Sequence, residues 1–374
     1  MKLIILRKNL KDGLKRIEKI ASENSNLPIL KNFLIESCNN KIKLSATNLE
    51  IAIITLIPGK IVEEGAITIP LTIFNSIIGN IQNERISLET ENDKLIIKTD
   101  NYSAEINGIK KEEFPIIPNI ENTKFYFEIS NILLLENLTS IISSANNKNS
   151  KQELNGVLFD FQTNLVKLAT TDTFRLSEKT INKSQFESNI NKDFKIIIPI
   201  LTIFEVIKEL QINENGKALI YFDPNQILFK IEDTQIISRL INGEFPDYQQ
   251  IIPKKIEIEA VLETEQLINA VKLSSVFSDR FNEIKFLIKE DYQNIEIFSV
   301  NQTIGENKYI ISIKNKIKLE NQLEMAFNWQ FLLDGIKNIK SENISLGLNT
   351  ENKPIIIKSP EDHSWFYILM PLKV

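Results

Sequence analysis

Two stretches of the sequence, ITIPLTIF at residues 67–74 and IIIPILTIF at residues 196–204, share an apolar strand-like run, a proline and the string LTIF. Their prolines, Pro70 and Pro199, are separated by 199 − 70 = 129 residues. A further step of 129 residues leads to Asn328 in LEMAFNWQFLLDGI, which has the same strand-then-helix pattern without the proline. This spacing predicts that one structural unit occurs three times in the chain.

Two more markers repeat in the same order. An apolar strand precedes a polar turn by thirteen residues in three places, at Leu34 and Thr47, Leu158 and Thr171, and Leu287 and Val300. The strings INGIKKEEFPIIP at 106–118 and INGEFPDYQQIIP at 241–253 then close the first two units. The chain therefore contains three diverged repeats of roughly 125 residues, each too long for a solenoid repeat.

Each repeat has the same predicted order of elements. It opens with a short strand and an amphipathic helix, expected at 9–22, 131–146 and 263–277, and continues in alternating or continuous apolar strands. A second strand–helix pair starts near Pro70, Pro199 or Asn328. The pattern predicts an α+β protein with antiparallel sheets, in three domains at 1–121, 122–252 and 253–374, each with its own core.

The composition excludes several classes of protein. The chain has 43% hydrophobic and 25% charged residues, as soluble globular proteins do, and its net charge of −5 indicates that any nucleic-acid-binding surface is local. One cysteine, Cys38, excludes an intrachain disulfide and favours a reducing compartment. The apolar run at residues 3–6 is too short for a signal peptide or a membrane span. We expect a cytoplasmic protein with no membrane partner.

Catalytic chemistry is not indicated. The only histidine, His363, lies in a turn-like stretch, and with a single cysteine it offers no zinc-ligand spacing or Cys/His pair. The eleven glycines are not clustered as a dinucleotide fold or P-loop requires, and no GxSxG elbow occurs. Carboxylates are scattered. We expect no catalytic residue, no metal site and no cofactor, although a hydrolase built on scattered acids stays an alternative.

A polar turn interrupts the strand-like stretch LATTDTFRLSEK at residues 168–179. The first repeat has a similar Thr–Asn turn at 45–48, which favours a bend stabilised by short polar side chains that bond their own backbone. Such a bend leaves the flanking side chains free for function.

A row of cations follows the first predicted helix. Lys8, Lys11, Lys15 and Lys19 lie within about 80° of one another at 100° per residue. Leu10, Leu14, Ile17 and Ala21 form the opposite, apolar stripe. The lysine row is consistent with an ordinary solvated face or with contacts to a nucleic-acid backbone.

The repeats together with LPIL at 27–30, SATNLEI, TDTFRL, INGEFPDYQQIIP and the terminal MPLKV resemble the beta sliding clamp, the beta subunit of bacterial DNA polymerase III. This resemblance covers essentially the whole chain. It implies a head-to-tail ring homodimer of DNA-clamp domains, with helices inside and antiparallel sheets outside, that encircles double-stranded DNA and tethers the replicative polymerase for processive DNA replication without being an enzyme.

The resemblance also implies a pocket between domains 2 and 3 for short linear peptides of the replicative polymerase subunit and the clamp loader. Its expected residues are Leu154, Thr171, Thr173, Phe174, Arg175, Leu176, Pro246, Ile251, Ile368, Leu369, Met370, Pro371 and Leu372. The family's usual Gly–His pair is Thr173–Phe174 here, and Gln250 replaces a commonly basic residue. The pocket is therefore expected to be more apolar.

Two further sets of residues follow from the resemblance. The DNA-facing set is Lys8, Lys11, Lys15, Lys19, Asn24, Lys148 and Lys151, where Asn24 stands in a loop position that is often basic. The dimer interface is expected to join Ala104 and Ile106 to Val276 and Phe277, although Phe277 could instead pack within domain 3. A repeat protein that acts only as an interaction scaffold is the other alternative function.

Overall fold

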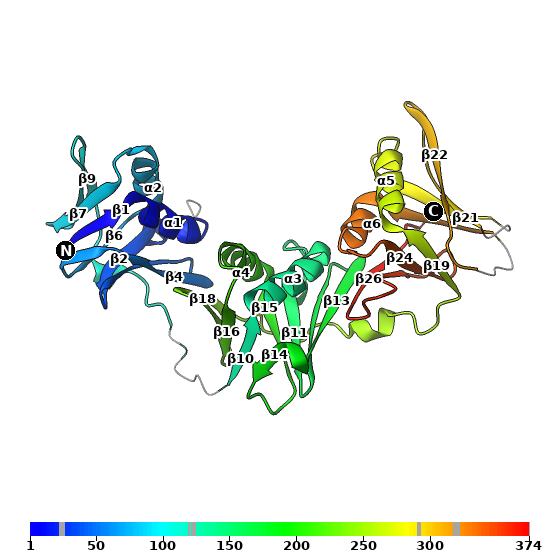
Figure 1. Ribbon diagram of the computed structural model, residues 1–374, viewed down its shortest axis with the longest axis horizontal. Coiled ribbons are helices and arrows are strands. Elements are labelled where there is room, and N and C mark those ends of the chain that lie inside the picture. The colour runs from blue at the N-terminus through cyan, green and yellow to red at the C-terminus, as the bar shows by residue number, and fades with distance from the viewer. Residues whose placement is uncertain (22–26, 119, 121–124, 290–292, 317–321, 374) are drawn as a thin grey trace. The chain divides into compact units, whose positions relative to one another are not determined.

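The computed structural model describes residues 1–21, 27–118, 120, 125–289, 293–316 and 322–373 (Figure 1). The chain forms two compact units. Unit 1 comprises Met1–Leu135, Phe186–Ile190 and Leu201–Leu240, and unit 2 comprises Glu136–Gln185, Asn191–Ile200 and Ile241–Val374. The division between the units therefore runs through the second repeat.

In its described part, unit 1 contains two antiparallel sheets. The five-stranded sheet has the order β5-β1-β7-β8-β9 and the nine-stranded sheet has the order β14-β10-β16-β17-β18-β4-β3-β2-β6. Their strands are β1 (Lys2–Leu6), β2 (Asn32–Cys38), β3 (Lys41–Thr47), β4 (Ile51–Pro58), β5 (Lys60–Glu63), β6 (Ala66–Pro70), β7 (Arg85–Glu91), β8 (Lys94–Lys98), β9 (Ser103–Asn107), β10 (Tyr126–Ser130), β14 (Phe186–Ser188), β16 (Lys217–Phe222), β17 (Gln226–Ile231) and β18 (Thr234–Arg239).

Unit 2 also contains two antiparallel sheets in its described part. Their orders are β15-β11-β12-β13-β26-β25-β24-β19 and β22-β21-β20-β23. The strands are β11 (Gly156–Gln162), β12 (Leu165–Thr171), β13 (Arg175–Asn182), β15 (Phe194–Pro199), β19 (Ile258–Glu263), β20 (Glu283–Ile288), β21 (Asn294–Asn301), β22 (Gly305–Ser312), β23 (Leu323–Asn328), β24 (Asn343–Leu348), β25 (Ile355–Lys358) and β26 (Trp365–Leu369). The α+β class with antiparallel sheets is confirmed.

The helices repeat with the strands. The first helices of the three repeats are α1 (Arg7–Ile17), α3 (Asn131–Ile141) and α5 (Thr264–Ser275), and the second helices are α2 (Leu71–Asn80), α4 (Ile200–Ile212) and α6 (Trp329–Ile336). The second helices start at Leu71, Ile200 and Trp329, so the 129-residue spacing read from the sequence is confirmed. Proline precedes two of them because its fixed φ suits the entry to a helix, and Asn328 caps the third by accepting hydrogen bonds from the N–H groups of Gln330 and Phe331.

The expected bounds of the first helices were wrong at their ends. Helix α1 ends at Ile17 instead of residue 22, and a tighter turn follows, in which the N–H of Ile20 bonds the carbonyl of Ile17. Helix α3 passes into the 3-10 helix η3 (Ile142–Ser144), and α5 ends two residues before the expected position. Buried apolar residues such as Ile20 and Ala21 extend the periodic pattern past the true end of the helix.

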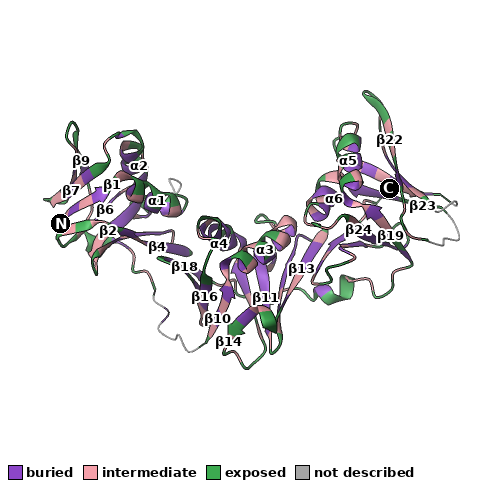
Figure 2. Cartoon of the chain, viewed as in Figure 1, coloured by how far each residue is buried: buried purple, intermediate pink, exposed green. Residues whose placement is uncertain are grey.

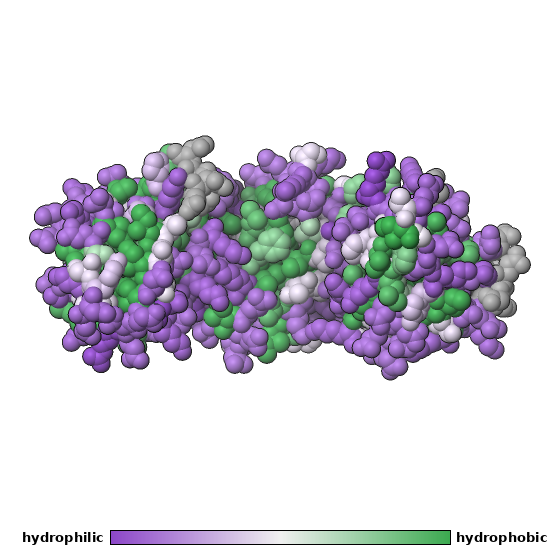
Figure 3. Space-filling view, turned by 90° about the horizontal axis from the view of Figure 1, so that it is seen from above, coloured by the Kyte–Doolittle hydropathy of each residue, from purple (hydrophilic) through white to green (hydrophobic). Residues whose placement is uncertain are grey.

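Strand pairing joins successive repeats edge to edge. Strand β4 of the first repeat pairs with β18 of the second, and β13 of the second pairs with β26 of the third. The buried residues in Figure 2 follow these sheets and the inward faces of the helices. On the face drawn in Figure 3, hydrophilic side chains cover most of the surface and apolar ones gather in separate patches. Among the helices in the described residues, none is long and apolar enough to span a membrane.

Candidate partner-binding and nucleic-acid interfaces

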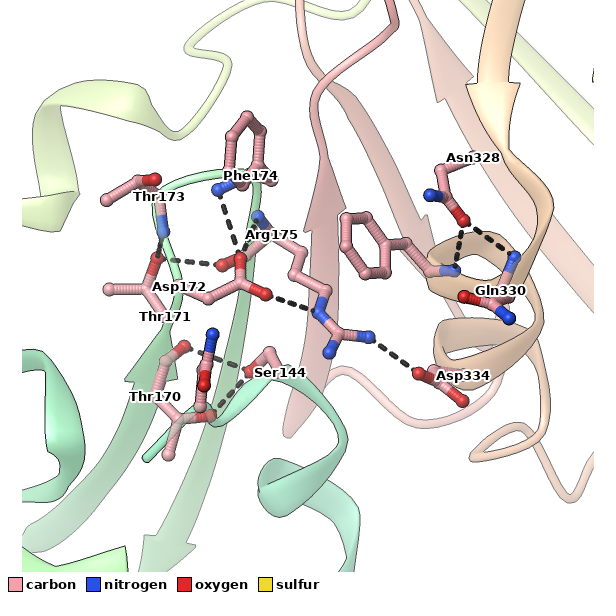
Figure 4. Close-up of polar contacts among 12 residues, drawn as sticks. Ser144, Thr170, Thr171, Asp172, Thr173, Phe174, Arg175, Asn328, Gln330 and Asp334 are labelled. Carbon is pink, nitrogen blue, oxygen red and sulfur yellow. Dashed lines mark hydrogen bonds and ion pairs between the residues drawn. The ribbon is translucent and has the colours of Figure 1, made fainter. Parts of the chain in front are cut away.

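The polar stretch after β12 forms a tight turn that is held by its own side chains (Figure 4). Thr171 Oγ1 donates to the carbonyl of Arg175 at 2.7 Å and accepts from the N–H of Thr173. Asp172 Oδ1 accepts from the N–H groups of Phe174 and Arg175, each at 3.0 Å. These bonds hold Thr173 at a φ of +79°, which a β-branched residue rarely adopts.

The first repeat contains the same turn. Thr47 Oγ1 donates to the carbonyl of Ile51 and accepts from the N–H of Leu49, and Asn48 Oδ1 accepts from the N–H groups of Glu50 and Ile51. Leu49 has a φ of +76°, close to that of the matching residue in the second repeat. The prediction of a bend stabilised by short polar side chains is therefore confirmed, and the function of the second turn must depend on the side chains that flank it.

Arg175 is the flanking side chain with the most contacts. Its Nε lies 2.8 Å from Asp172 Oδ2 and its Nη1 lies 2.6 Å from Asp334 Oδ2 of helix α6. The guanidinium carbon is 4.2 Å from the centre of the Phe331 ring, a cation–π distance. Burial opposes the charge, but the neighbouring Tyr367 phenol and the two carboxylates outweigh it and raise the pKa of Arg175 above its ordinary value.

Strands β13 and β26 bring the turn to the C-terminal segment. Arg175 pairs with Leu369 and Leu176 with Ile368 across the two strands. Beyond the strand ends, the N–H of Met370 donates to the carbonyl of Phe174 at 2.8 Å. The N–H of Leu372 donates to the carbonyl of Ala326 in β23, which fixes the last residues of the chain that the structure describes.

A second segment covers the outer face of these strands. The 3-10 helix η6 (Tyr248–Ile251) lies in the FPDYQQIIP stretch, and Tyr248 Oη donates to the buried carboxylate of Glu178 at 2.6 Å. Burial and this hydrogen bond raise the pKa of Tyr248, so the phenol stays protonated. Tyr248 packs in a cluster with Leu158, Ala169 and Ile368. The segment that carries Pro246 and Ile251 is therefore anchored beside the β13–β26 pair.

The expected pocket residues differ in exposure. The exposed ones are Thr173, Phe174, Pro246, Ile251 and Met370, the partly buried ones are Arg175, Pro371 and Leu372, and the buried ones are Leu154, Thr171, Leu176, Ile368 and Leu369. Phe174 is the most prominent, because 59% of it is exposed although its ring centre is 6.4 Å from that of Phe331. The exposed ring of Phe174, beside the partly buried Phe331 and an arginine whose charge is balanced by two carboxylates, can hold an apolar side chain of a partner.

Phe331 and Asp334 were missed by the sequence reasoning. Both lie on α6, in the string WQFLLDGI, and reach Arg175 across a large sequence separation. In the 129-residue repeat spacing, Asp334 corresponds to Glu205 of α4, which is also acidic. That match was the one signal in the sequence that marked the position.

The corresponding junction in unit 1 has different chemistry. There the N–H of Arg239 donates to the carbonyl of Glu50, as Met370 does to Phe174 in unit 2. Glu50 and Arg239 are exposed, and Arg239 Nη1 lies 3.9 Å from Glu50 Oε1 in an ion pair. Ile51 occupies the position that Arg175 has in unit 2. An exposed charged pair does not favour an apolar anchor, so the two junctions differ in the side chains that they could bind.

The lysine row of α1 is exposed. Lys8, Lys11 and Lys15 lie on the helix and Lys19 lies in the turn after it. No ion pair involves these four lysines within the described ranges. Leu10, Leu14 and Ile17 are fully buried on the opposite side, as expected. Arg16 is different, because its Nε lies 3.1 Å from the buried carboxylate of Glu209, and it is unavailable to a ligand.

The other residues predicted to face DNA are less uniform. Lys148 and Lys151 are exposed in the loop after η3, whereas Asn24 lies outside the described residues. Helix α4 carries exposed Leu201 and Phe204, and its one lysine, Lys208, is partly buried beside Glu205. The cations are thus concentrated on the first helix.

The expected interface positions lie on or near two edge strands. Strand β9, with Ala104 half-buried and Ile106 buried, is the outer strand of the five-stranded sheet. Strand β22 is an outer strand in unit 2, and exposed Val276 and half-buried Phe277 follow α5 near its first residue, Gly305. Within the described part of the chain, each of these strands has a neighbouring strand on one side only, and such an edge is a template for pairing with another chain. Three or more His, Cys, Asp or Glu side chains do not gather as a metal site anywhere in the described ranges.

Three tandem α+β repeats are joined strand to strand, and the β13–β26 junction of unit 2 differs in its side chains from the β4–β18 junction of unit 1. This arrangement defines a clamp-type fold. Family models of the DNA polymerase III beta subunit match the chain in order: the N-terminal domain at residues 1–118, the central domain at 128–247 and the C-terminal domain at 249–373. The chain belongs to this family, the beta sliding clamps.

The similarity to individual relatives extends over the full length of both chains. The beta sliding clamp of Chlamydia pneumoniae is 28% identical over 380 residues, covering 100% of this chain and 99% of that protein. The beta sliding clamp of Buchnera aphidicola is 29% identical over 382 residues, covering 100% of both. The crystal structure of the Bacillus subtilis DNA polymerase sliding clamp superposes with a TM-score of 0.93 at 22% identity, covering 100% of this chain and 99% of that one, and so supports the fold.

Proposed function

We propose that the protein is a DNA sliding clamp. Two copies close head to tail into a ring around double-stranded DNA and tether the replicative polymerase for processive synthesis. The observation that carries this proposal is the match of three successive beta-subunit domains to nearly the whole chain. The domain bounds that we propose are 1–121, 122–252 and 253–374, of which the junction at 121–122 lies outside the described residues.

A ring explains why a weakly basic surface is enough. Non-specific phosphate contacts bind with a Kd of roughly 10⁻⁴ to 10⁻⁶ M at physiological salt, which permits sliding but does not retain a polymerase. Enclosure supplies the retention. Lys8, Lys11, Lys15 and Lys19 then keep the duplex centred, with Lys148 and Lys151 as further contacts, and the net charge of −5 discourages binding of DNA elsewhere on the surface.

The ring closes between the two open sheet edges. Strand β9 of one copy, with Ala104 and Ile106, pairs with the β22 edge of the other, and Val276 and Phe277 cover the junction. Pairing satisfies the free backbone groups of both edges. The exposed apolar side chains Leu273, Val276, Phe281, Ile304 and Ile310 of unit 2 would be removed from water in the same contact.

Partners bind at the junction of unit 2 where β13 pairs with β26. A short peptide of the polymerase or the clamp loader lays an apolar anchor between Phe174, Met370 and the segment that carries Ile251, over the walls formed by Leu154, Leu176 and Ile368. Thr171, Thr173, Arg175, Pro246, Leu369, Pro371 and Leu372 shape this pocket. The site performs no chemical step, so the protein acts without catalytic residues, metal or cofactor.

A primer-extension assay tests the function. A singly primed circular template is copied by a bacterial DNA polymerase III core with its clamp loader, with and without this protein, under a trap that allows one binding event. The proposal expects products lengthened by an order of magnitude or more when the protein is present. Products of unchanged length, obtained with a loader that binds the protein, would contradict it.

A further inference from the structure

Glu178 is a buried carboxylate that lies beside the expected peptide pocket without belonging to it. It is on β13, two residues after Leu176, and because side chains alternate along a strand the two face the same side of the sheet. Its side chain is 5% exposed, and Oε1 lies 3.4 Å from Nζ of Lys167. A carboxylate is costly to bury unless it is paired and hydrogen-bonded, so its other partners are informative.

The second oxygen of Glu178 binds the segment at 244–252. Tyr248 Oη donates to Oε2 at 2.6 Å, and Gln249 Nε2 donates to the same oxygen at 3.2 Å. Both donors belong to η6, which ends at Ile251. One carboxylate therefore holds two successive side chains of the segment against the sheet.

The segment also has internal bonds, which keep its shape but do not attach it to the sheet. Gln250 Nε2 donates to Asp247 Oδ2 at 2.9 Å, and the N–H of Tyr248 donates to the carbonyl of Pro246 at 2.7 Å. The polar attachment of this turn to the sheet therefore depends on Glu178.

This attachment lies next to the two pocket residues of the segment. Phe245 and Ile252 pack against the cluster that includes Ile368 of the pocket. Pro246 and Ile251 are their direct neighbours in the sequence. A shift of η6 away from the sheet would consequently move both pocket residues.

The first repeat lacks both halves of the contact. Ile54 occupies the position of Glu178, because it pairs with Ser45 as Glu178 pairs with Ala169. The string EFPIIP of the first repeat corresponds to EFPDYQQIIP of the second, so the residues DYQQ have no counterpart there. The acceptor and its two donors thus occur together in the second repeat, which favours a joint role.

We infer that Glu178 is a positioning residue of the peptide site, which holds η6 through Tyr248 and Gln249 so that Pro246 and Ile251 are in place before a partner binds. This inference rests on the proposed function of that site. A partner that meets an ordered wall loses no binding free energy to ordering it. The apparent Kd equals the intrinsic Kd divided by the fraction of protein in the competent arrangement, so Glu178 raises the affinity without contacting the peptide.

Peptide binding to full-length variants tests this inference. The probe is a fluorescein-labelled tail peptide of the polymerase subunit used in the primer-extension assay, and fluorescence anisotropy gives the Kd. Glu178→Ala removes the acceptor of both donors and should weaken binding about tenfold. Glu178→Gln keeps an acceptor oxygen and should recover most of the affinity.

Tyr248→Phe is the milder variant, because it removes the hydroxyl and keeps the ring in its cluster. It should weaken binding about threefold. Combined with Glu178→Ala, it should cause no further loss, because the hydroxyl acts only through that carboxylate. Additive losses in the double variant would contradict the joint role.

Hydrogen exchange followed by mass spectrometry separates positioning from general destabilisation. Glu178→Ala should speed exchange in residues 244–252 and leave exchange in the four-stranded sheet of unit 2 unchanged. Thr264→Val is the matched control. It removes another buried hydroxyl bond of unit 2, which Thr264 Oγ1 donates to the carbonyl of Ser341 at 2.9 Å, and it should leave the peptide Kd unchanged.

The outcomes distinguish this inference from the proposed function. Saturable binding to wild type with an unchanged Kd for Glu178→Ala would remove the positioning role and leave the partner site standing. Equal weakening by Thr264→Val would show that binding only follows the stability of unit 2. Faster exchange in residues 244–252 without weaker binding would show that the segment is not a wall of the site. An absence of binding to wild type would contradict the partner site and the inference together.

Discussion

Arg175 Nη1 lies 2.6 Å from Oδ2 of Asp334, which is 159 residues further along the chain. The same guanidinium holds Asp172, the residue that caps the turn carrying Phe174. One side chain therefore connects a turn of the second repeat to a helix of the third. This connection fixes the position at which Phe174 is presented.

Replacing Arg175 should destabilise unit 2 strongly. Arg175→Gln leaves Asp172, whose side chain is 4% exposed, without its cation, and loss of one member of such a pair costs about 3 kcal/mol. Urea unfolding followed by tryptophan fluorescence measures this directly, since both tryptophans, Trp329 and Trp365, lie in unit 2.

Asp334 provides the comparison. Its side chain is 44% exposed, so solvent screens the pair and Asp334→Asn should cost about 1 kcal/mol or less. Lys340→Gln, which breaks the exposed pair with Glu136, serves as the control and should leave the transition almost unchanged. If Asp334→Asn were as costly as Arg175→Gln, Asp172 would not be the carboxylate that depends on Arg175.

Phe174→Ala should weaken binding of a partner peptide about tenfold, because exposed aromatic anchors dominate such interfaces. Its effect on stability should be small, since the ring is 59% exposed. Fluorescence anisotropy with a labelled polymerase-tail peptide gives the Kd. Phe125→Ala, an equal truncation of a 45% exposed ring in unit 1, is the matched control. An unchanged Kd for Phe174→Ala would place the anchor elsewhere.

The lysine row should determine how DNA binding depends on salt. Replacing Lys8, Lys11 and Lys15 together by Ala should reduce the slope of log K against log salt concentration by about three, roughly one for each lost phosphate contact. Binding to linear duplex DNA over a salt series measures the slope. The triple replacement of exposed Lys60, Lys192 and Lys254 changes the net charge equally, and an equal loss there would show that the row has no special role.

Acid should weaken one contact of the five-stranded sheet. Hydrogen bonds from Lys2 and Lys98 lower the pKa of Glu89 from 4.5 to about 2. Because the folded pKa is the lower one, the contribution is fully present above pH 4.5 and is lost as the pH falls toward 2. The stability difference between wild type and Glu89→Gln, from urea unfolding by circular dichroism, should shrink over this window.

The neighbouring carboxyl of Glu91, also on β7, supplies the control. Glu91→Gln should leave the Glu89 contribution in place, so that its acid profile follows the wild type between pH 4.5 and 2. A Glu89→Gln difference that stayed constant across the window would show that the two lysines do not depend on the ionised carboxylate.

The features that could be predicted from the sequence are those that depend on residues close together in the chain. The starts of α2, α4 and α6 followed from a proline or asparagine at a fixed spacing, and the turn at Thr171 followed from side chains that bond their own backbone. Both signals lie within a few residues of the structure they specify. The burial of Leu10, Leu14 and Ile17 followed from helical periodicity for the same reason.

Contacts between distant residues were not predictable in this way. Asp334 and Phe331 meet Arg175, and Arg16 meets Glu209 193 residues away, only because strands of successive repeats pair. Arg16 has the same charge as the lysines around it, so the sequence did not distinguish a buried pair from an exposed cation.

The central claim is enclosure of DNA, and the most direct measurement is topological. The protein is loaded onto nicked circular DNA by a clamp loader, the circle is then linearised, and retention is followed by gel filtration at high salt. A ring predicts retention on the circle and release after linearisation, both insensitive to salt. Retention that is lost in high salt and indifferent to linearisation would show that binding is electrostatic only, and would contradict the clamp function.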